Sequence, residues 1–262
     1  MTSKTFIKNV EHESAIKHVT GRAIYTDDIS EPRNLLHAAI GFSPVSKGII
    51  EKIDYSEVLN SDGVVDIITE KDIEGQNDVG PIFKGDKIFT SKKIEYHGQP
   101  IFAVIASSTI LARKALLKVK LKIKKQKPII TIDDAIRKKS CVLKSKTIKR
   151  GKSNTAITNS KHRLTGKLEC GGQDHFYLEG QIAMTIPQED NNFLIYSSTQ
   201  HPSETQQIVA KVLNQKFNSI NVKVRRIGGG LGGKETQTFL FAAITRIAAK
   251  KLNRPVKLRI DR

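Results

Sequence analysis

The chain has 262 residues, of which 38% are hydrophobic and 27% charged. This composition is typical of a globular protein with one large or two ordinary domains. No run of about 18 apolar residues is present, and the start lacks the apolar core of a secretory signal, so we expect a cytoplasmic protein without a membrane span. Cys141 and Cys170 are the only cysteines, which excludes a disulfide framework and an iron–sulfur site within this chain.

The net charge of +18 raises the question of nucleic-acid binding, because lysine and arginine neutralise phosphates. Only 6% of the residues are aromatic, tryptophan is absent, and the basic residues are scattered over most of the chain. No sequence motif of a nucleic-acid-binding module is recognisable. We therefore expect basic solvent-exposed surfaces and no nucleic-acid partner.

The first half of the chain alternates short strands and helices. Apolar runs at 64–68 and 101–106 predict buried strands, and residues 109–117 predict a helix. The segment 118–124 alternates lysine with apolar residues, a pattern typical of a half-exposed strand whose lysines prevent edge-to-edge pairing.

We expect the chain to have four parts. Residues 1–20 are expected to form an N-terminal arm and 21–127 a first domain. The polar and basic stretch 128–161, with a short helix near 133–138, is typical of a linker. Residues 162–262 begin a second domain.

The second domain is expected to contain strands around 183–186, 193–196 and 222–226. One helix is predicted from Ser203 to about Asn214, because Ser203 and Gln206 have the spacing of a capping box. Another is predicted at 236–252, where apolar residues recur at helical spacing and Asn253-Arg254-Pro255 ends the run.

The most informative stretch is a glycine loop, residues 228–233, which follows a predicted strand and precedes a predicted helix. Five of its six residues are glycine, the exception being Leu231. Glycine allows positive φ and close approach of the backbone, and N–H groups at a helix start can face an anion. The loop could bind a ligand, or it could be only a tight strand-to-helix turn.

A phosphate-binding loop is one alternative. Gly228, Gly233 and Lys234 fit its spacing, but Glu235 stands where a serine or threonine should hold magnesium. A carboxylate there would repel a triphosphate.

A dinucleotide-binding turn is another alternative. Gly228, Gly230 and Gly233 satisfy G-x-G-x-x-G, and residues 256–260 followed by Asp261 imitate the next strand with its ribose-binding acid. The preceding strand, however, alternates with charge, which is not typical of a buried parallel strand.

Several separated motifs together resemble one family, the molybdenum-binding subunits of xanthine dehydrogenases among the molybdenum hydroxylases. They are Gly-Arg-Ala-Ile-Tyr-Thr-Asp-Asp at 21–28, Glu-Tyr-His-Gly-Gln-Pro at 95–100, Gly-Gly-Gln-Asp-His-Phe-Tyr-Leu-Glu at 171–179, Ser-Ser-Thr-Gln-His-Pro at 197–202, and the glycine loop. Their order and spacing are similar to the family from about residue 10 onward.

This resemblance implies an α+β fold: an aldehyde oxidase/xanthine dehydrogenase a/b hammerhead domain, followed by the truncated start of a molybdopterin-binding domain. It also implies a molybdenum–molybdopterin cofactor. The implied activity is oxidation of hypoxanthine or xanthine in purine catabolism. The His-Pro-Ser-Glu run at 201–204 is more similar to bacterial xanthine dehydrogenases than to aldehyde oxidases.

The resemblance assigns roles to five residues. Gln200, which matches a family glutamine, would donate an amide hydrogen bond to an oxygen ligand of molybdenum and so lie near the metal without ligating it. Gly230, Leu231 and Gly232 would approach the cofactor, with Leu231 beside the metal where the family usually has phenylalanine. Glu235 would bind the purine. The alternative is that this glutamate only interacts favourably with the helix dipole, because it stands in the first turn of the predicted helix.

Three histidines, His97, His175 and His201, could be considered as metal ligands. They are not spaced as a cluster, and the family's molybdenum is held by pterin sulfurs. We therefore expect them to have structural roles.

In the family, the glutamate that acts as general base, a substrate-binding arginine and most pterin contacts follow the point matching Arg262. No catalytic residue is therefore expected in this chain, which would be a fragment or half of a split subunit, inactive alone. Iron–sulfur and FAD centres are expected on a partner subunit, giving a hetero-oligomer. The alternative is a catalytically inactive assembly or interaction module.

Overall fold

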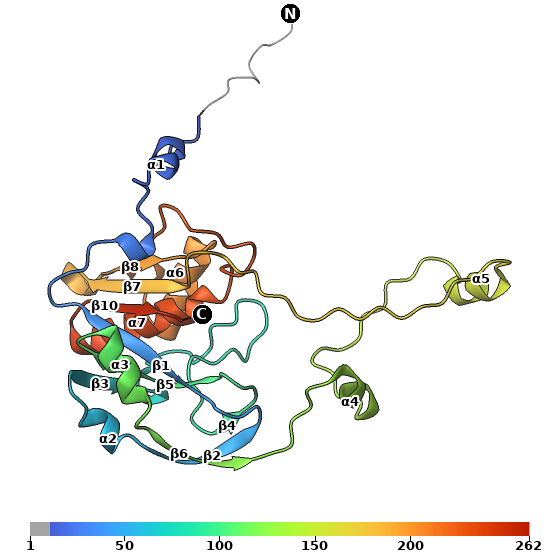
Figure 1. Ribbon diagram of the computed structural model, residues 1–262, viewed down its shortest axis with the longest axis horizontal. Coiled ribbons are helices and arrows are strands. Elements are labelled where there is room, and N and C mark those ends of the chain that lie inside the picture. Colours follow the sequence, from blue (N-terminus) through green and yellow to red (C-terminus); the bar gives the residue numbers. More distant parts are fainter. Residues whose placement is uncertain (1–10, 262) are drawn as a thin grey trace, which may run out of the picture. The chain divides into compact units, whose positions relative to one another are not determined.

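The computed structural model describes residues 11–261, so residues 1–10 of the expected arm lie outside the described residues. The chain forms two compact units. The larger combines the residues up to Gln126 with those from His175 onward, and the smaller is Lys127–Asp174 (Figure 1).

The larger unit contains a seven-stranded sheet in the order β3-β5-β1-β10-β7-β8-β9. In chain order its strands are β1 (Leu36–Phe42), β3 (Val64–Ile68), β5 (Pro100–Ala106), β7 (Ile182–Pro187), β8 (Phe193–Ser197), β9 (Ile220–Lys223) and β10 (Val256–Arg259). The pairs β1–β10 and β8–β9 are parallel and the others antiparallel. Strands from before and after the smaller unit therefore share one sheet, with β10 between β1 and β7.

A second sheet has the order β4-β2-β6 and is antiparallel. Its strands are β2 (Gly48–Asp54), β4 (Lys93–Ile94) and β6 (Lys120–Lys125). In β6 Leu121 and Ile123 are half-buried while the lysines are exposed, and β6 lies at the edge. The predicted half-exposed, lysine-rich strand is confirmed.

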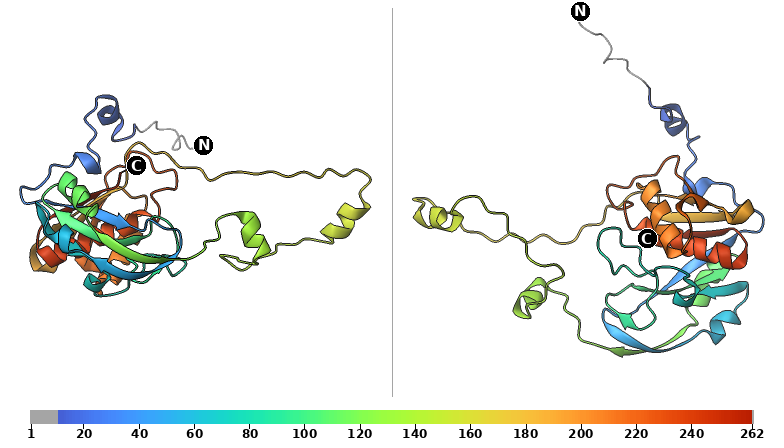
Figure 2. Two further views of the ribbon diagram at one scale, coloured as in Figure 1. Left: turned by 60° about the horizontal axis from the view of Figure 1, so that its bottom comes forward. Right: turned by 180° about the vertical axis from the view of Figure 1, so that it is seen from behind.

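The helices of the larger unit are α1 (Ala15–Val19), α2 (Ser56–Leu59), α3 (Thr109–Leu116), α6 (Pro202–Val212) and α7 (Thr238–Leu252), with 3-10 turns at η2 (Thr26–Asp28), η3 (Glu70–Asp72), η4 (Glu189–Asn191) and η5 (Phe217–Ser219). Figures 1 and 2 show α6 and α7 together beside β7, β8 and β10. Successive side chains of a strand point to opposite faces of the sheet, so β1 contributes to two separate hydrophobic clusters. Ala38 and Ile40 of β1 join the cluster that contains α7, whereas Ala39 contacts Ala112 of α3.

The predicted strands and helices are largely found, with one difference in burial. Residues 101–106 are fully buried in β5, as expected. Strand β3 lies at the edge of the large sheet and Val65 is 44% exposed. The prediction of a buried strand at 64–68 is therefore wrong for its first half, because an edge strand has a neighbour on one side only.

The predicted capping box is also wrong. Helix α6 begins at Pro202, with His201 at the N-cap and no side-chain cap. Proline lacks an N–H and has the φ of a first helical residue, so it starts the helix one residue before Ser203. The Gln206 amide donates instead to the carbonyl oxygens of Phe217 and Ile220, which ties α6 to the start of β9.

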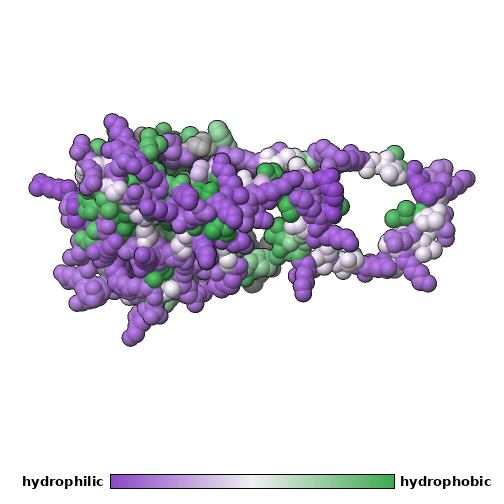
Figure 3. All heavy atoms as spheres, turned by 90° about the horizontal axis from the view of Figure 1, so that it is seen from below, coloured by the Kyte–Doolittle hydropathy of each residue, from purple (hydrophilic) through white to green (hydrophobic). Residues whose placement is uncertain are grey.

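Two further helix predictions agree with the structure. Helix α7 ends at Leu252, where Asn253 has the left-handed φ of 48° and the proline follows. The short helix predicted near 133–138 is α4 (Ile132–Arg137) of the smaller unit, which also contains α5 (Ser153–Asn159). The face of the molecule drawn in Figure 3 is mostly hydrophilic. Among the described residues, no helix has the length and apolar character needed to cross a membrane.

Arg246 is a charged residue in the centre of α7 with no exposed surface. Its Nη2 donates to Gln215 at 2.7 Å and its guanidinium faces the Phe193 ring, but Nε and Nη1 have no hydrogen-bond partner among the described residues. Burial lowers its pKa to about 9, partly offset by the charge of Glu74. The folded state therefore disfavours the charged form of this side chain.

We expect Arg246→Met to raise the free energy of unfolding, by up to about 4 kcal/mol, as happens when buried ionic groups are replaced by apolar ones. Urea denaturation followed by circular dichroism measures the change. The control is Arg113→Met, which removes an exposed ion pair with Asp261 and should change stability by less than about 1 kcal/mol. A lower stability of the Arg246 variant than of the control would contradict the expectation.

Candidate functional site

The sheet topology brings Gln200 and the glycine loop together at the carboxyl ends of two neighbouring strands of the large sheet. Strands β8 and β9 are parallel neighbours, with Tyr196 opposite Lys223, so the segments that leave them emerge on the same side. Gln200 lies three residues after β8, and the loop at 228–233 follows β9.

Gln200 contacts the loop directly. Its side-chain Oε1 accepts hydrogen bonds from the backbone N–H groups of Gly232 at 3.0 Å and Lys234 at 3.3 Å. The backbone N–H of Gln200 donates to the carbonyl oxygen of Lys234 at 2.9 Å. Two segments that the sequence analysis assigned to one site are therefore joined by three hydrogen bonds.

These bonds determine which way the Gln200 amide faces. A carboxamide has one oxygen that accepts and one NH₂ that donates, and only the oxygen can receive two backbone N–H groups. The NH₂ group must therefore point away from Lys234 and Gly232. Gln200 is exposed, and its NH₂ group offers two uncharged donors.

The loop has little room for side chains at this point. A Cβ atom on Gly230 would lie 2.5 Å from Oε1 of Gln200, which is closer than real contacts allow. The next residue, Leu231, has a φ of 53° and is 77% exposed. A leucine held in the left-handed region costs conformational energy, so the surrounding hydrogen bonds impose this backbone path.

A buried polar cluster, which was not predicted from the sequence, lies beneath the loop. Lys234 has a completely buried side chain whose ammonium donates to Ser198 Oγ at 2.7 Å and Glu179 Oε2 at 3.2 Å, and lies 4.7 Å from the centre of the Tyr177 ring. The Glu179 side chain is only 8% exposed. Glu179 is the last residue of one motif of the resemblance and Lys234 directly follows another, and this position was the available signal.

The position of Lys234 argues against a phosphate-binding loop. Its ammonium is paired below the loop with Glu179, so it could reach a phosphate only by breaking a buried ion pair. The loop retains the glycine spacing of such a motif without its cation. This opposes nucleotide binding through residues 228–234.

The dinucleotide-binding alternative disagrees with the strand order. That fold needs the strand after the crossover helix to lie in parallel near the strand before it. Strand β10 is instead separated from β9 by β7 and β8. Asp261, which would bind the ribose, is paired with Arg113 at 3.1 Å.

Glu235 is the first residue beyond the buried part of the loop, and its side chain is 55% exposed. It lies 3.8 Å from Nε2 of His201, whose Nδ1 is 3.5 Å from Glu204. A carboxylate and an imidazole thus lie beside Gln200. His201 contacts carboxylates here, and the described residues contain no group of three or more His, Cys, Asp or Glu side chains that could hold a metal ion.

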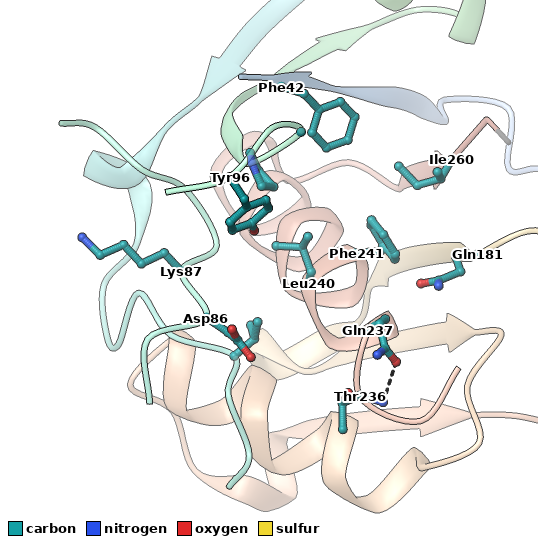
Figure 4. Close-up of a pocket in the computed structure, with 13 residues that line it drawn as sticks. Phe42, Asp86, Lys87, Tyr96, Gln181, Thr236, Gln237, Leu240, Phe241 and Ile260 are labelled. Atoms are coloured by element: carbon teal, nitrogen blue, oxygen red, sulfur yellow. Dashed lines mark hydrogen bonds between the residues drawn. The ribbon is translucent and has the colours of Figure 1, made fainter. Parts of the chain in front are cut away.

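A cavity of about 470 Å³ lies beside the start of α7 (Figure 4). Figure 4 shows the rings of Phe42, Tyr96 and Phe241 around it, with Gln181 on one side. Thr236 and Gln237, which follow Glu235, also line it. The Gln181 amide nitrogen donates to Tyr177 Oη at 2.7 Å and the Gly233 carbonyl oxygen at 3.2 Å, so one side chain connects the cavity wall to the glycine loop.

Comparison with known proteins identifies both parts of the chain. Residues 20–127 match the a/b hammerhead domain of aldehyde oxidase and xanthine dehydrogenase, and residues 135–262 match the molybdopterin cofactor-binding domain. A hammerhead domain followed by the start of a cofactor-binding domain confirms the predicted fold class. Together with the loop, it defines the class as that of the molybdenum hydroxylases.

Relatives in both branches of this class are similarly close. Aldehyde oxidase 2 of Rattus norvegicus is 38% identical over 255 residues, which is 97% of this chain and 19% of the relative. Xanthine dehydrogenase of Dictyostelium discoideum is 36% identical over 253 residues, or 97% of this chain and 18% of the relative. The chain belongs to the aldehyde oxidase and xanthine dehydrogenase family.

A solved structure agrees with this assignment. The aldehyde oxidoreductase of Desulfovibrio gigas superposes with a TM-score of 0.83 and 25% identity, covering 95% of this chain and 29% of that one. The chain thus spans about a fifth of the curated relatives and less than a third of this structure.

Proposed function

We propose that this chain supplies part of the molybdopterin site of a molybdenum hydroxylase. The Gln200 amide, whose oxygen accepts from the backbone N–H groups of Gly232 and Lys234, is the observation that carries the proposal. It suits an uncharged hydrogen bond to the cofactor. Gly232 and Leu231 are exposed, and the missing side chain of Gly232 allows close approach of a ligand to the backbone.

The molybdenum–molybdopterin group would supply the two-electron redox chemistry by which this family oxidises its substrates. This chain's residues would orient that group: Gln200 by an amide hydrogen bond, Gly230 and Gly232 through their backbone, and Leu231 as an apolar wall. Leucine has less area than a phenylalanine ring, so we expect a roomier wall. None of these side chains is placed to remove a proton from a substrate, and we assign the catalytic base to another part of the complete enzyme.

We further propose hypoxanthine or xanthine as the substrate, with Glu235 as a binding residue. An exposed carboxylate beside Gln200 can accept from purine N–H groups, or donate to a ring nitrogen when protonated. Nε2 of His201 lies 3.8 Å from this carboxylate. The proposal includes a cytoplasmic hetero-oligomer in which a partner subunit carries the iron–sulfur and FAD centres.

The test is to isolate the chain, carrying an affinity tag, from the cells that produce it and to measure molybdenum by mass spectrometry and pterin by fluorescence. We expect molybdenum and pterin in the assembly, and oxidation of xanthine or hypoxanthine. Gln200→Ala should lower molybdenum content or turnover by about 10- to 100-fold, the usual loss when a residue that orients a metal site is removed.

Gln206→Ala serves as the matched control, because Gln206 only links α6 to the Phe217 and Ile220 carbonyls. A folded assembly that contains neither molybdenum nor pterin would contradict the proposal. It would favour the second candidate, an assembly or interaction module that keeps the hammerhead fold without the chemistry.

A further inference from the structure

The glycine loop is attached to the sheet at its first residue by Glu179. The backbone N–H of Gly228 donates to Glu179 Oε2 at 2.8 Å, and the backbone N–H of Glu179 donates to the Gly228 carbonyl oxygen at 3.1 Å. The same carboxylate accepts from the backbone N–H of Thr26 through Oε1 at 3.1 Å. One side chain thus connects the loop to the segment that precedes the hammerhead strands.

The other end of the loop is attached through Lys234, the residue that directly follows it. The Lys234 ammonium reaches Oε2 of Glu179, the same oxygen that holds Gly228. Ser198 Oγ completes a triangle, because it donates to Glu179 Oε2 at 2.6 Å and accepts from Lys234 at 2.7 Å. Both ends of the loop therefore converge on a single carboxylate oxygen.

The backbone of Lys234 transmits this attachment to Gln200. Lys234 donates its N–H to Gln200 Oε1 and accepts the Gln200 N–H with its carbonyl oxygen. If the Lys234 side chain lost its buried partner, the backbone that orients the Gln200 amide would lose its fixed position.

We infer that Glu179, Ser198 and Lys234 are positioning residues that lock the glycine loop at both ends and thereby set the direction of the Gln200 amide. Hereafter they are called the loop clamp. Their importance for cofactor binding rests on the proposed function, whereas their effect on the loop backbone does not depend on it. Charge-assisted hydrogen bonds in a buried site suit this task, because they are strong and directional.

The test is hydrogen exchange of the full chain, followed amide by amide by NMR. Glu179→Gln removes a negative charge that the buried Lys234 ammonium contacts. It should raise the exchange rates of the Gly228, Gly232 and Lys234 amides at least tenfold, through local opening of the loop. Amides in the distant strand β5 should remain within twofold of the unmodified chain. If these residues contributed only to global stability, the exchange rates of the loop amides and of the β5 amides would rise together.

Ser198→Ala is the second variant, and it decides the matter if Glu179→Gln does not fold. It keeps both charges but removes the hydroxyl that both contact, so a smaller acceleration confined to the same loop amides is expected. The matched control is Glu74→Gln, which removes an exposed carboxylate paired with Lys250 and should leave the loop amides unchanged. The inference would be overturned if the exchange rates of the loop amides stay within twofold of those in the unmodified chain in every clamp variant that folds. It would also be overturned if the exchange rates of the β5 amides rise in parallel.

Molybdenum content of the assembly isolated from cells gives a separate readout. Glu179→Gln should lower it at least tenfold, as is expected for Gln200→Ala, while Glu74→Gln should leave it unchanged. If the unmodified assembly contains no molybdenum, the proposed function fails and hydrogen exchange alone decides the loop clamp. If the metal is present but neither loop amides nor molybdenum content respond to the clamp variants, the clamp fails while the proposed function stands.

Discussion

Gly230→Ala is expected to lower the molybdenum content of the isolated assembly by about 10- to 100-fold, the range for residues that orient a metal site. The added Cβ would lie 2.5 Å from Gln200 Oε1 and 2.9 Å from its Cδ. The side chain must then move and lose its hydrogen bonds to Gly232 and Lys234. Gly230 has no positive φ among the described backbone angles, so the effect arises from the displaced amide.

Gly180→Ala is the matched control for this substitution. Its Cβ would lie 3.5 Å from the Ile260 carbonyl oxygen, an ordinary contact, and it follows Glu179 directly in the chain. We expect molybdenum content close to that of the unmodified protein. Stability of both variants should be measured by urea denaturation, where Gly230→Ala should cost about 1–3 kcal/mol as overpacked sites do. Unchanged metal content in Gly230→Ala would contradict the orientation assigned to Gln200.

Lys234→Met is expected to lower the free energy of unfolding by about 3–5 kcal/mol, because it leaves the Glu179 carboxylate buried without its cation. Methionine has a similar length and is apolar, so the lost packing is small. Urea denaturation with two independent probes measures the change. The loss would be several times that caused by removing an exposed lysine.

Lys250→Met supplies that comparison. Lys250 donates to Glu74 at 2.6 Å on the surface of the larger unit, and an exposed pair of this kind contributes about 0–1 kcal/mol. If the two lysine variants lose similar stability, the buried pair is not the anchor that its geometry indicates. A large loss for Lys234→Met alone would support it.

Much of the local structure could be predicted from the sequence. Apolar residues and their periodicity predicted β5 and α7, and the alternation of lysine predicted the edge strand β6. The run Asn253-Arg254-Pro255 predicted the last residue of α7 correctly. These features depend on neighbours a few residues apart. The start of α6 was placed one residue late, because capping-box spacing was given more weight than the proline at 202.

The sequence also indicated which segments carry the candidate site. The glycine loop and Gln200 were named from motifs, and the structure joins them by hydrogen bonds. Their roles toward a cofactor and the role of Glu235 stay predictions. The loop clamp was missed, since nothing in the spacing of Glu179 and Lys234 shows that residues 55 apart share a buried hydrogen bond.

By itself, the sequence therefore determined the family, the local elements and the loop with its accessible backbone, because periodicity, spacing and motif order are readable along the chain. Only the tertiary structure decided that β10 lies between β1 and β7, and that Glu179 meets Lys234 beneath the loop. The physical reason is that sheet order and buried charge pairing depend on which distant segments bury the most apolar surface together. That free energy belongs to the whole fold and leaves no local pattern.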